Sequence, residues 1–163
     1  MLITLKEDIK KICWILYKKD YWRVTVLLIV SIFLIKSNFK VYLVKGDSME
    51  PNLNNHEVFI VNFLAHKIFG IKRYDVLVLI DDEGDGVVKR VVGMPKERVK
   101  LTNGVIYIDG KRKDFPLAVY RDAMAMTTEE ITLKEGEYFF IGDNRGNTSF
   151  GITREENIIG LLK

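Results

Sequence analysis

Apolar positions divide the chain into two parts. The first is dominated by an uncharged run of 12 residues, Val24–Ile35. A helix of that length spans only about 18 Å, whereas the hydrocarbon core of a bilayer is about 30 Å thick. Extending the helix over the 18 residues from Trp22 to Phe39 gives about 27 Å, provided that the flanking lysines and arginine reach toward the interfaces. The pattern therefore predicts a membrane-spanning helix, which we assign to residues 22–40.

The charges around this run predict its orientation. Residues 1–23 hold six basic and three acidic side chains, a net charge of +3. A basic excess before a spanning helix places that end in the cytoplasm. We therefore expect residues 1–21 to be cytoplasmic and residues 41–163 to be extracytoplasmic. Two alternatives are a buried core helix and a cleaved secretory signal, although "KSNFKVYLV" offers no small-x-small cleavage site.

After the run, the pattern is typical of short β-strands. The segments "HEVFIVNFL", "YDVLVLI" and "EYFFIGD" are rich in β-branched and aromatic residues. The dipeptides Asn103-Gly104 and Asp109-Gly110 bracket "VIYI" and predict consecutive hairpins. Residues 117–130 are compatible with a short helix. We expect a mainly β fold, an antiparallel β-sheet or barrel-like domain, with one N-terminal transmembrane helix.

Composition excludes several classes of protein. The overall charge of +3 is already present in residues 1–23, so the other 140 residues are balanced, which argues against a nucleic-acid partner. Cys13 is the only cysteine and allows no intramolecular disulfide. The sequence has no metal-ligand spacing, no paired carboxylates and no phosphate-binding loop. We therefore expect no metal and no cofactor.

Ser48 lies in a loop suited to present a nucleophile. In "GDSMEP", Gly46 permits unusual backbone angles and Pro51 fixes φ and discourages a helix. Such a loop exposes both the hydroxyl and the amide N–H of Ser48, although an ordinary serine in a turn fits the motif equally well. A serine hydroxyl needs a base, because it is a weak nucleophile at its free pKa.

Lys89 is the candidate base. In "GVVKRVVG", strand alternation places Val87, Lys89 and Val91 on one face and Arg90 on the other. Burial among valines disfavours the ammonium and lowers a lysine pKa, whereas arginine stays protonated. The alternative is a solvent-facing Lys-Arg pair that protects an edge strand.

A third polar motif, "GDNRGNTSFG", follows the strand "YFFI". Asp143 and Arg145 are candidates to pair with Arg90 and with the backbone. Asn147, Thr148 and Ser149 offer an amide and hydroxyls that can orient an amine. Taken alone, the motif also fits a simple turn.

Together the motifs resemble those of the bacterial type I signal peptidases. "GDSMEPNL" is similar to the nucleophile motif of that family, "RYDVLVL" to its next strand, "VVKRVVGMP" to its base motif and "GDNRGNT" to its last motif. The resemblance runs from the anchor to the C-terminus. It implies a Ser-Lys dyad, with Ser48 as the nucleophile and Lys89 as the general base.

The resemblance also implies supporting roles. Arg90, Asp143 and Arg145 match structural positions, and Thr148 replaces a serine whose hydroxyl holds the lysine amine. The oxyanion hole includes the Ser48 N–H, while Gly46 stands where some members supply a second hydroxyl. Met49 and the valines near Lys89 are candidate walls of the cleft, beside Pro51. In one place the chain departs from the family, which continues as S-x-D-S-R: here Phe150 replaces the aspartate and leaves its ion pair vacant.

The implied function is removal of signal peptides from secretory precursors after small residues, at the bacterial cell membrane, with lipid as a further partner. The resemblance implies no oligomeric state. Alternatives are a soluble self-cleaving Ser-Lys repressor, which would carry a DNA-binding domain instead of an anchor, and a non-catalytic anchored assembly factor. A histidine-dependent hydrolase would need His56 or His66, which we expect at the surface.

The segment "NFLAHKIFGIK", residues 62–72, is more apolar than a solvated connection. Phe63, Leu64, Ile68, Phe69 and Ile71 are its apolar members. They either complete the core or contact the outer face of the bilayer, with Lys67 and Lys72 at the level of the headgroups.

Overall fold

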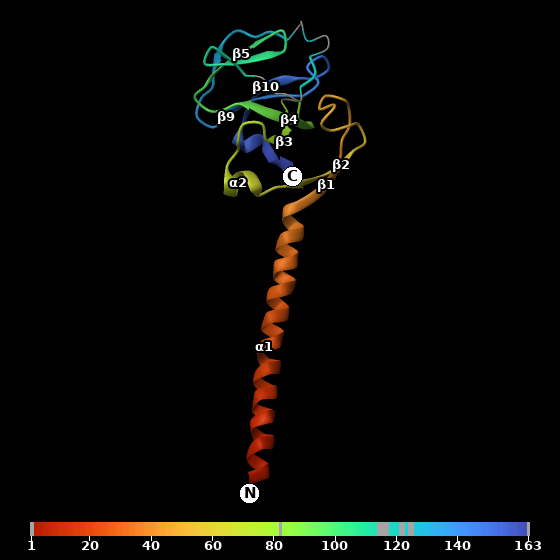
Figure 1. The fold of residues 1–163 in the computed structure, drawn as a ribbon, viewed down its shortest axis with the longest axis vertical. Helices are drawn as coiled ribbons and strands as arrows, with labels where there is room; N and C mark the ends of the chain where they lie inside the picture. Colours follow the sequence, from red (N-terminus) through yellow and green to blue (C-terminus); the bar gives the residue numbers. More distant parts are fainter. Residues whose placement is uncertain (1, 82, 114–117, 121–122, 124–125, 163) are drawn as a thin grey trace. The chain divides into compact units, whose positions relative to one another are not determined.

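The computed structural model describes residues 2–81, 83–113, 118–120, 123 and 126–162. The chain divides into two compact units, Met1–Asn38 and Phe39–Lys163. The first unit is one helix, α1 (Leu2–Asn38), and the second is built mainly from strands (Figure 1). The prediction of a mainly β domain that follows an apolar helix is therefore confirmed.

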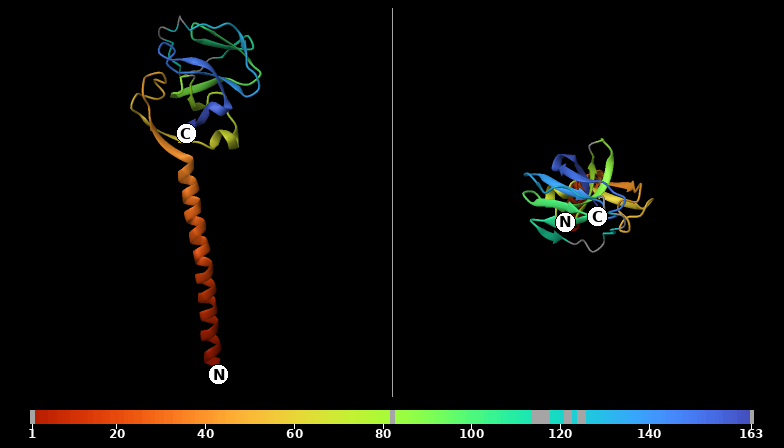
Figure 2. Two further views of the ribbon diagram at one scale, coloured as in Figure 1. Left: turned by 180° about the vertical axis from the view of Figure 1, so that it is seen from behind. Right: turned by 90° about the horizontal axis from the view of Figure 1, so that it is seen from above.

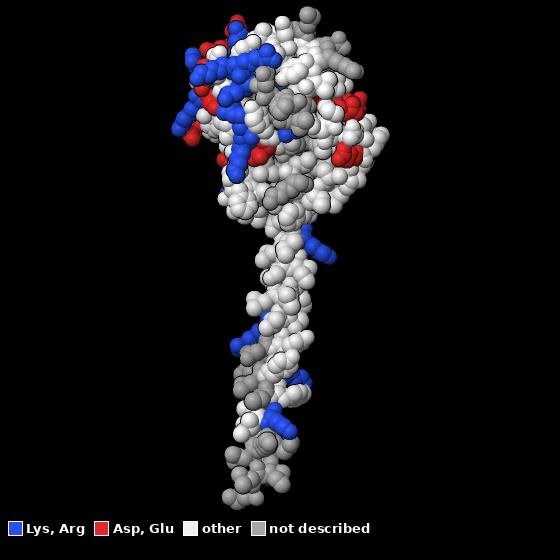
Figure 3. Space-filling model, viewed as in Figure 1, with Lys and Arg blue, Asp and Glu red and all other residues white. Residues whose placement is uncertain are grey.

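Helix α1 contains one stretch that is long and apolar enough to cross a membrane, Tyr21–Asn38, with a mean hydropathy of 1.3. None of this stretch is buried. Between Arg23 and Lys36 no residue is charged, and Figure 3 shows uncharged surface along this part of the helix. The helix ends at Asn38, so Phe39 and Lys40, which the sequence placed in the anchor, belong to the first strand instead.

The second unit contains two antiparallel sheets (Figure 2). The larger has the strand order β1-β2-β11-β3-β4-β9-β10 and the smaller has the order β7-β6-β5-β8. The strands of the larger sheet are β1 (Phe39–Leu43), β2 (Val58–Asn62), β3 (Val76–Ile80), β4 (Gly86–Gly93), β9 (Glu137–Ile141), β10 (Phe150–Arg154) and β11 (Ile158–Leu162). The smaller sheet contains β5 (Arg98–Thr102), β6 (Val105–Ile108), β7 (Lys111–Lys113) and β8 (Ile131–Thr132). The described residues of the unit also form two short helices, α2 (Ala65–Phe69) and η2 (Glu155–Asn157).

The two predicted hairpin turns form as expected. Asn103 and Gly104 connect β5 to β6 with φ of 50° and 76°, and Asp109 and Gly110 connect β6 to β7 with φ of 49° and 74°. Two successive positive φ values give the turn whose twist matches that of the flanking strands, and Asn-Gly and Asp-Gly adopt it readily. The meander around "VIYI" is thus set by local sequence.

The helix expected over residues 117–130 does not form as an α-helix in the described part of that segment; residues 117, 121–122 and 124–125 lie outside the description. Val119 instead forms a parallel β-bridge with Asn144. The hydroxyls of Thr127 and Thr128 accept hydrogen bonds from the N–H groups of Asn103 and Leu101, at 3.2 and 3.1 Å. These hydroxyls therefore bind the backbone of the smaller sheet, and the segment follows that sheet rather than its own helical propensity.

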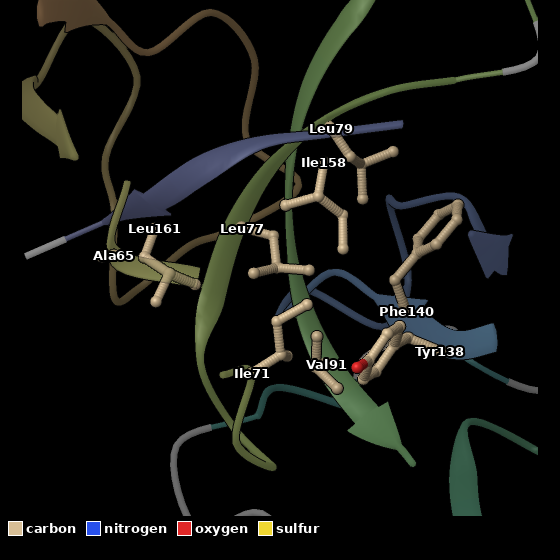
Figure 4. Close-up of a cluster of buried hydrophobic side chains, with 9 residues drawn as sticks. All are labelled: Ala65, Ile71, Leu77, Leu79, Val91, Tyr138, Phe140, Ile158 and Leu161. Atoms are coloured by element: carbon tan, nitrogen blue, oxygen red, sulfur yellow. The ribbon is translucent and has the colours of Figure 1, made fainter. Parts of the chain in front are cut away.

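One hydrophobic cluster that packs against the larger sheet positions the strand that carries Lys89. Leu77 and Leu79 of β3 pack with Val91 of β4, with Phe140 of β9 and with Ile158 of β11 (Figure 4). In the β3–β4 ladder, Leu77 lies directly opposite Lys89 and Leu79 opposite Val87. Burial of these apolar side chains fixes the register of β4, because a slip of one residue would exchange its two faces.

Candidate active site

Ser48 lies in the loop that connects β1 to β2. The two ends of the loop are joined by hydrogen bonds from Val44 N to Glu57 O and from His56 N to Val44 O, both 2.9 Å. Gly46 has a φ of +89°, and its N–H donates to Asn55 Oδ1 at 3.2 Å. Met49, the residue that follows the serine, is buried in a cluster with Val44 and anchors the loop. The peptide bond before Pro51 is cis. The loop thus holds Ser48 between an apolar anchor and a glycine turn.

Lys89 reaches Ser48 from the middle of β4. Its side chain is 4% exposed, and its Nζ lies 2.9 Å from Ser48 Oγ in a hydrogen bond. Burial lowers the pKa of the Lys89 amine, and the negative charge of Asp81 opposes that shift. A neutral amine in this place can accept the proton of the hydroxyl that it contacts. The two predicted residues are thus brought together in hydrogen-bond contact.

Arg90 points from the opposite face of β4 and is held by Asp143. Its Nε and Nη2 donate to Asp143 Oδ1 and Oδ2 at 2.8 and 2.6 Å, and its Nη1 donates to Tyr74 O at 2.7 Å. Asn52, in the loop after Ser48, donates to the same carboxylate at 2.8 Å. The pairing of Arg90 with Asp143 was predicted from sequence. It ties β4, the Ser48 loop and the β9–β10 loop to one buried charge.

The β9–β10 loop also contacts the backbone of Asp47 and Ser48. Asn144 N donates to Ser48 O at 3.1 Å, and Asn144 Nδ2 donates to Asp47 O at 3.2 Å. Arg145 is fully buried, and its Nη1 donates to Gly142 O at 2.8 Å. Sequence reasoning missed Asn52 and Asn144, because an asparagine beside aspartate or proline is read as turn chemistry. Their contacts span more than ninety residues of sequence.

Thr148 lies beside the Ser48 backbone but does not hold the lysine. A Cβ built on Gly142 would lie 2.0 Å from Thr148 Oγ1 and 2.3 Å from Ser48 O, so both atoms face the same glycine. The Thr148 hydroxyl donates to Ser149 O at 3.1 Å. In the part of the chain that the structure describes, no hydrogen bond joins this hydroxyl to Lys89. The implied contact is absent in this conformation, and the role of Thr148 stays a prediction.

A cavity of about 200 Å³ opens beside the two residues. Its walls are mainly apolar and include Met49 and Val88, as the sequence predicted for the cleft. Gly46 has no side chain and therefore adds no donor here. No heavy atom lies within 4 Å of where its Cβ would be. The arrangement suits attack on an amide carbonyl whose flanking side chains are small and apolar. Among the described residues, no group of His, Cys, Asp and Glu side chains could hold a metal ion.

The two histidines are far from equivalent. His56 is exposed, as expected, whereas His66 is 2% exposed and the expectation for it was wrong. Asn62 Oδ1 accepts hydrogen bonds from the N–H groups of Leu64 and Ala65, both at 3.0 Å, and starts the single turn of α2. That turn directs Ala65 and His66 inward. Burial lowers the pKa of His66, as does the charge of Lys67, while Glu155 opposes both.

Comparisons with known proteins show the family of this chain. Residues 18–163 match the family described as signal peptidase, peptidase S26. The sequence is 33% identical over 157 residues to signal peptidase I of Bacillus caldolyticus and 29% identical over 163 residues to signal peptidase IB of Staphylococcus aureus. Each alignment covers 86% of this chain and 85% of the relative. A crystal structure of a signal peptidase I from Enterococcus faecalis is 23% identical, with a TM-score of 0.47 over 57% of this chain and 97% of that one.

Proposed function

This chain belongs to the signal peptidase family, peptidase S26, and we propose that Ser48 and Lys89 form its catalytic dyad. The protein is a serine endopeptidase that removes signal peptides from secretory precursor proteins. The observation that supports the dyad is the 2.9 Å hydrogen bond between Lys89 Nζ and Ser48 Oγ, made by a lysine that is almost wholly buried.

Acylation follows from this contact. Ser48 Oγ attacks the carbonyl carbon of the scissile bond while the neutral Lys89 amine takes the hydroxyl proton. The N–H of Ser48 donates to the oxyanion that develops. The C–N bond then breaks, and the Lys89 ammonium gives its proton to the leaving amine, which is the new N-terminus of the mature protein. Ser48 is left as an ester of the signal peptide.

Deacylation uses the same base. Lys89, again neutral, takes a proton from water, and the hydroxide that forms attacks the ester carbonyl. The Ser48–acyl bond breaks, the proton returns to Ser48 Oγ, and the signal peptide leaves with a free carboxylate. Arg90, Asp143, Arg145 and Asn144 keep the two loops in place during both steps.

The test is cleavage of a precursor that carries an A-x-A site by the full chain in detergent. We expect one defined cut, which Ser48→Ala and Lys89→Ala each abolish. Lys100→Ala, which removes an exposed lysine from β5, is the matched control and should cleave normally. The non-catalytic assembly factor predicts no cut by any of the four proteins, and cleavage by the Lys89→Ala protein at the normal rate would contradict the dyad.

We propose that α1 anchors the protein with residues 1–21 in the cytoplasm, the apolar stretch within residues 22–40 in the bilayer, and residues 41–163 outside. Support comes from the uncharged stretch between Arg23 and Lys36 and from the basic excess before it. Single cysteines introduced at Lys10 and at Lys100, in a Cys13→Ser background, should be labelled from opposite sides of sealed vesicles by a membrane-impermeant maleimide. Labelling of both from one side would contradict this topology.

We also propose that α2 contacts lipid. Ile68 and Phe69 are each 64% exposed, Leu64 is exposed beside them, and Lys67 lies on the same turn. Phe63 and Ile71, also candidates from sequence, pack into the core instead. An apolar turn with a flanking cation suits the boundary between headgroups and acyl chains.

Vesicle co-sedimentation of the second compact unit, residues 39–163, tests this contact. Changing Ile68 and Phe69 together to serine should weaken binding to vesicles with anionic lipid, whereas Ile152→Ser, an exposed position on β10, should not. If both folded variants bind the vesicles equally well, α2 does not contact lipid and has only a structural role.

A further inference from the structure

Among the described residues, the Lys89 face of the β3–β4 hairpin carries a half-buried carboxylate, that of Asp81, and an exposed one, that of Asp85. Leu77 pairs with Lys89 and Leu79 pairs with Val87 across the ladder, and side chains two residues apart lie on the same face of a strand. Asp81 follows the end of β3 and continues this alternation. Its side chain is therefore displaced along the hairpin from Lys89, toward the turn, on the face from which Lys89 extends.

The turn holds Asp81 in a fixed position. Its backbone N–H donates to Asp85 O at 2.9 Å, and its Oδ1 accepts hydrogen bonds from the N–H groups of Glu83 and Asp85, at 3.1 and 2.8 Å. Asp81 also lines a cavity of about 300 Å³, whose lining includes Ser149 and Phe150 of the last motif. The carboxylate is thus oriented and half-buried rather than free in solvent.

The other described charges near Lys89 differ from Asp81 in burial, sign or pairing, and Asp85, on the same face by alternation, is exposed. Lys45 lines the same cavity as Lys89 and carries the same sign of charge, and β9 contributes Tyr138 to the face. Asp143 is bound to Arg90 on the opposite face. At position 150, where the last motif has no carboxylate, the phenylalanine stacks on Phe139 with 6.1 Å between ring centroids.

We propose that Asp81 is a positioning residue of this peptidase, a fixed negative charge that stabilises the ammonium formed when Lys89 takes the proton of Ser48. The proposal rests on the proposed dyad. In the described part of the chain, no carboxylate forms an ion pair with Lys89, so the resting amine is free to lose its proton. Relative to the neutral resting amine, a negative charge that acts from further away stabilises the ammonium as it forms in the transition state; it stabilises a resting ammonium too, and so raises the pKa of Lys89. The pKa of Lys89 is consistent with this, since burial lowers it and Asp81 opposes the lowering.

The test compares pH profiles of kcat/KM for Asp81→Asn, Asp81→Glu and Asp85→Asn in the full chain. Asparagine keeps an oxygen that can accept the two N–H bonds of the turn, so only the charge is lost. We expect the rising limb of the Asp81→Asn profile to move to lower pH, while its plateau falls about tenfold, a change of about 1.4 kcal/mol in activation free energy. Asp81→Glu should keep the wild-type position of the limb, and Asp85→Asn, in the same turn, should match the wild type throughout.

A uniform fall of the Asp81→Asn activity at every pH, or a profile that superposes on the wild type, would overturn the proposal. Equal urea midpoints for wild type and variants establish that the fold is intact; if Asp81→Asn does not fold, the glutamate variant decides, because a displaced limb there contradicts a charge effect. Lys89→Ala separates the two hypotheses. If it still cleaves, the dyad is wrong; if it is inactive while Asp81→Asn behaves as wild type, only the role of Asp81 is wrong.

Discussion

The two faces of β4 provide different partners for two neighbouring basic side chains. Lys89 and Arg90 are adjacent in sequence and almost equally buried, at 4% and 8% exposure. Arg90 meets a carboxylate that matches its two donor groups, whereas Lys89 meets a serine hydroxyl. The same strand therefore carries one charge that is fully compensated and one that is not.

The difference separates a structural role from a chemical one. A buried arginine stays protonated and must be paired, so it serves to join the segments that supply its partners. A buried lysine has another way to avoid the cost of an isolated charge, because it can release its proton. In the described part of the chain Lys89 forms no ion pair, which supports the proposal that it acts as a base.

The largest effect should come from replacing Lys89 with arginine, the residue type of its neighbour. Lys89→Arg keeps a long cationic side chain but removes the ability to deprotonate. We expect kcat/KM for precursor cleavage to fall about 10⁴-fold or more, as for loss of a nucleophile–base unit. Activity within tenfold of the wild type would mean that Lys89 is not the base.

Removing the partner of Arg90 should damage the fold rather than the chemistry. Asp143→Ala leaves a buried guanidinium uncompensated, and we expect the free energy of unfolding to fall by about 3–5 kcal/mol in urea denaturation. Glu135→Ala, which breaks the exposed Lys96–Glu135 pair, is the control and should leave the urea midpoint unchanged. A similar small change in both variants would show that the Arg90–Asp143 pair carries no structural load.

The reciprocal exchange, Arg90→Lys, should have a smaller effect. A lysine can reach Asp143 but cannot form the two parallel bonds of the guanidinium, nor the third to Tyr74 O. We expect a loss of about 1–3 kcal/mol in unfolding free energy, with cleavage retained in the folded fraction. Complete loss of cleavage in a folded variant would place Arg90 in the chemistry as well.

The smallest effect concerns the dependence of stability on pH. Because the pKa of Lys89 is lowered in the folded state, the unfolded chain binds this proton first. Stability therefore falls as pH drops below the unfolded value of about 10.4, until the folded amine also protonates. Lys89→Met should be more stable than the wild type at neutral pH, and the difference should shrink as pH rises and become constant above about pH 10.4. A constant difference over the whole range would mean that Lys89 stays charged in the fold.

Local patterns predicted the residues on the two faces of β4. Strand alternation around Lys89 and Arg90, and the Asn-Gly and Asp-Gly turns, depend on neighbours in sequence, and the structure confirms both. The burial of His66 escaped prediction because α2 has only five residues, too few to show a helical period. The path of residues 117–130 was not predicted, because Thr127 and Thr128 bind backbone N–H groups more than twenty residues away in sequence.

The close packing around Gly142 restricts which amino acids can occupy this position. Any other amino acid adds a Cβ, which at this position would lie 2.0 Å from Thr148 Oγ1 and 2.3 Å from the Ser48 carbonyl oxygen. One of those atoms is backbone of the nucleophile itself, so the clash cannot be relieved by rotating a side chain. Every missense change of this codon, however mild in chemistry, therefore displaces the serine loop or the threonine loop. Alanine, the smallest substitute, already carries the clashing Cβ, so no amino-acid change at this codon is conservative.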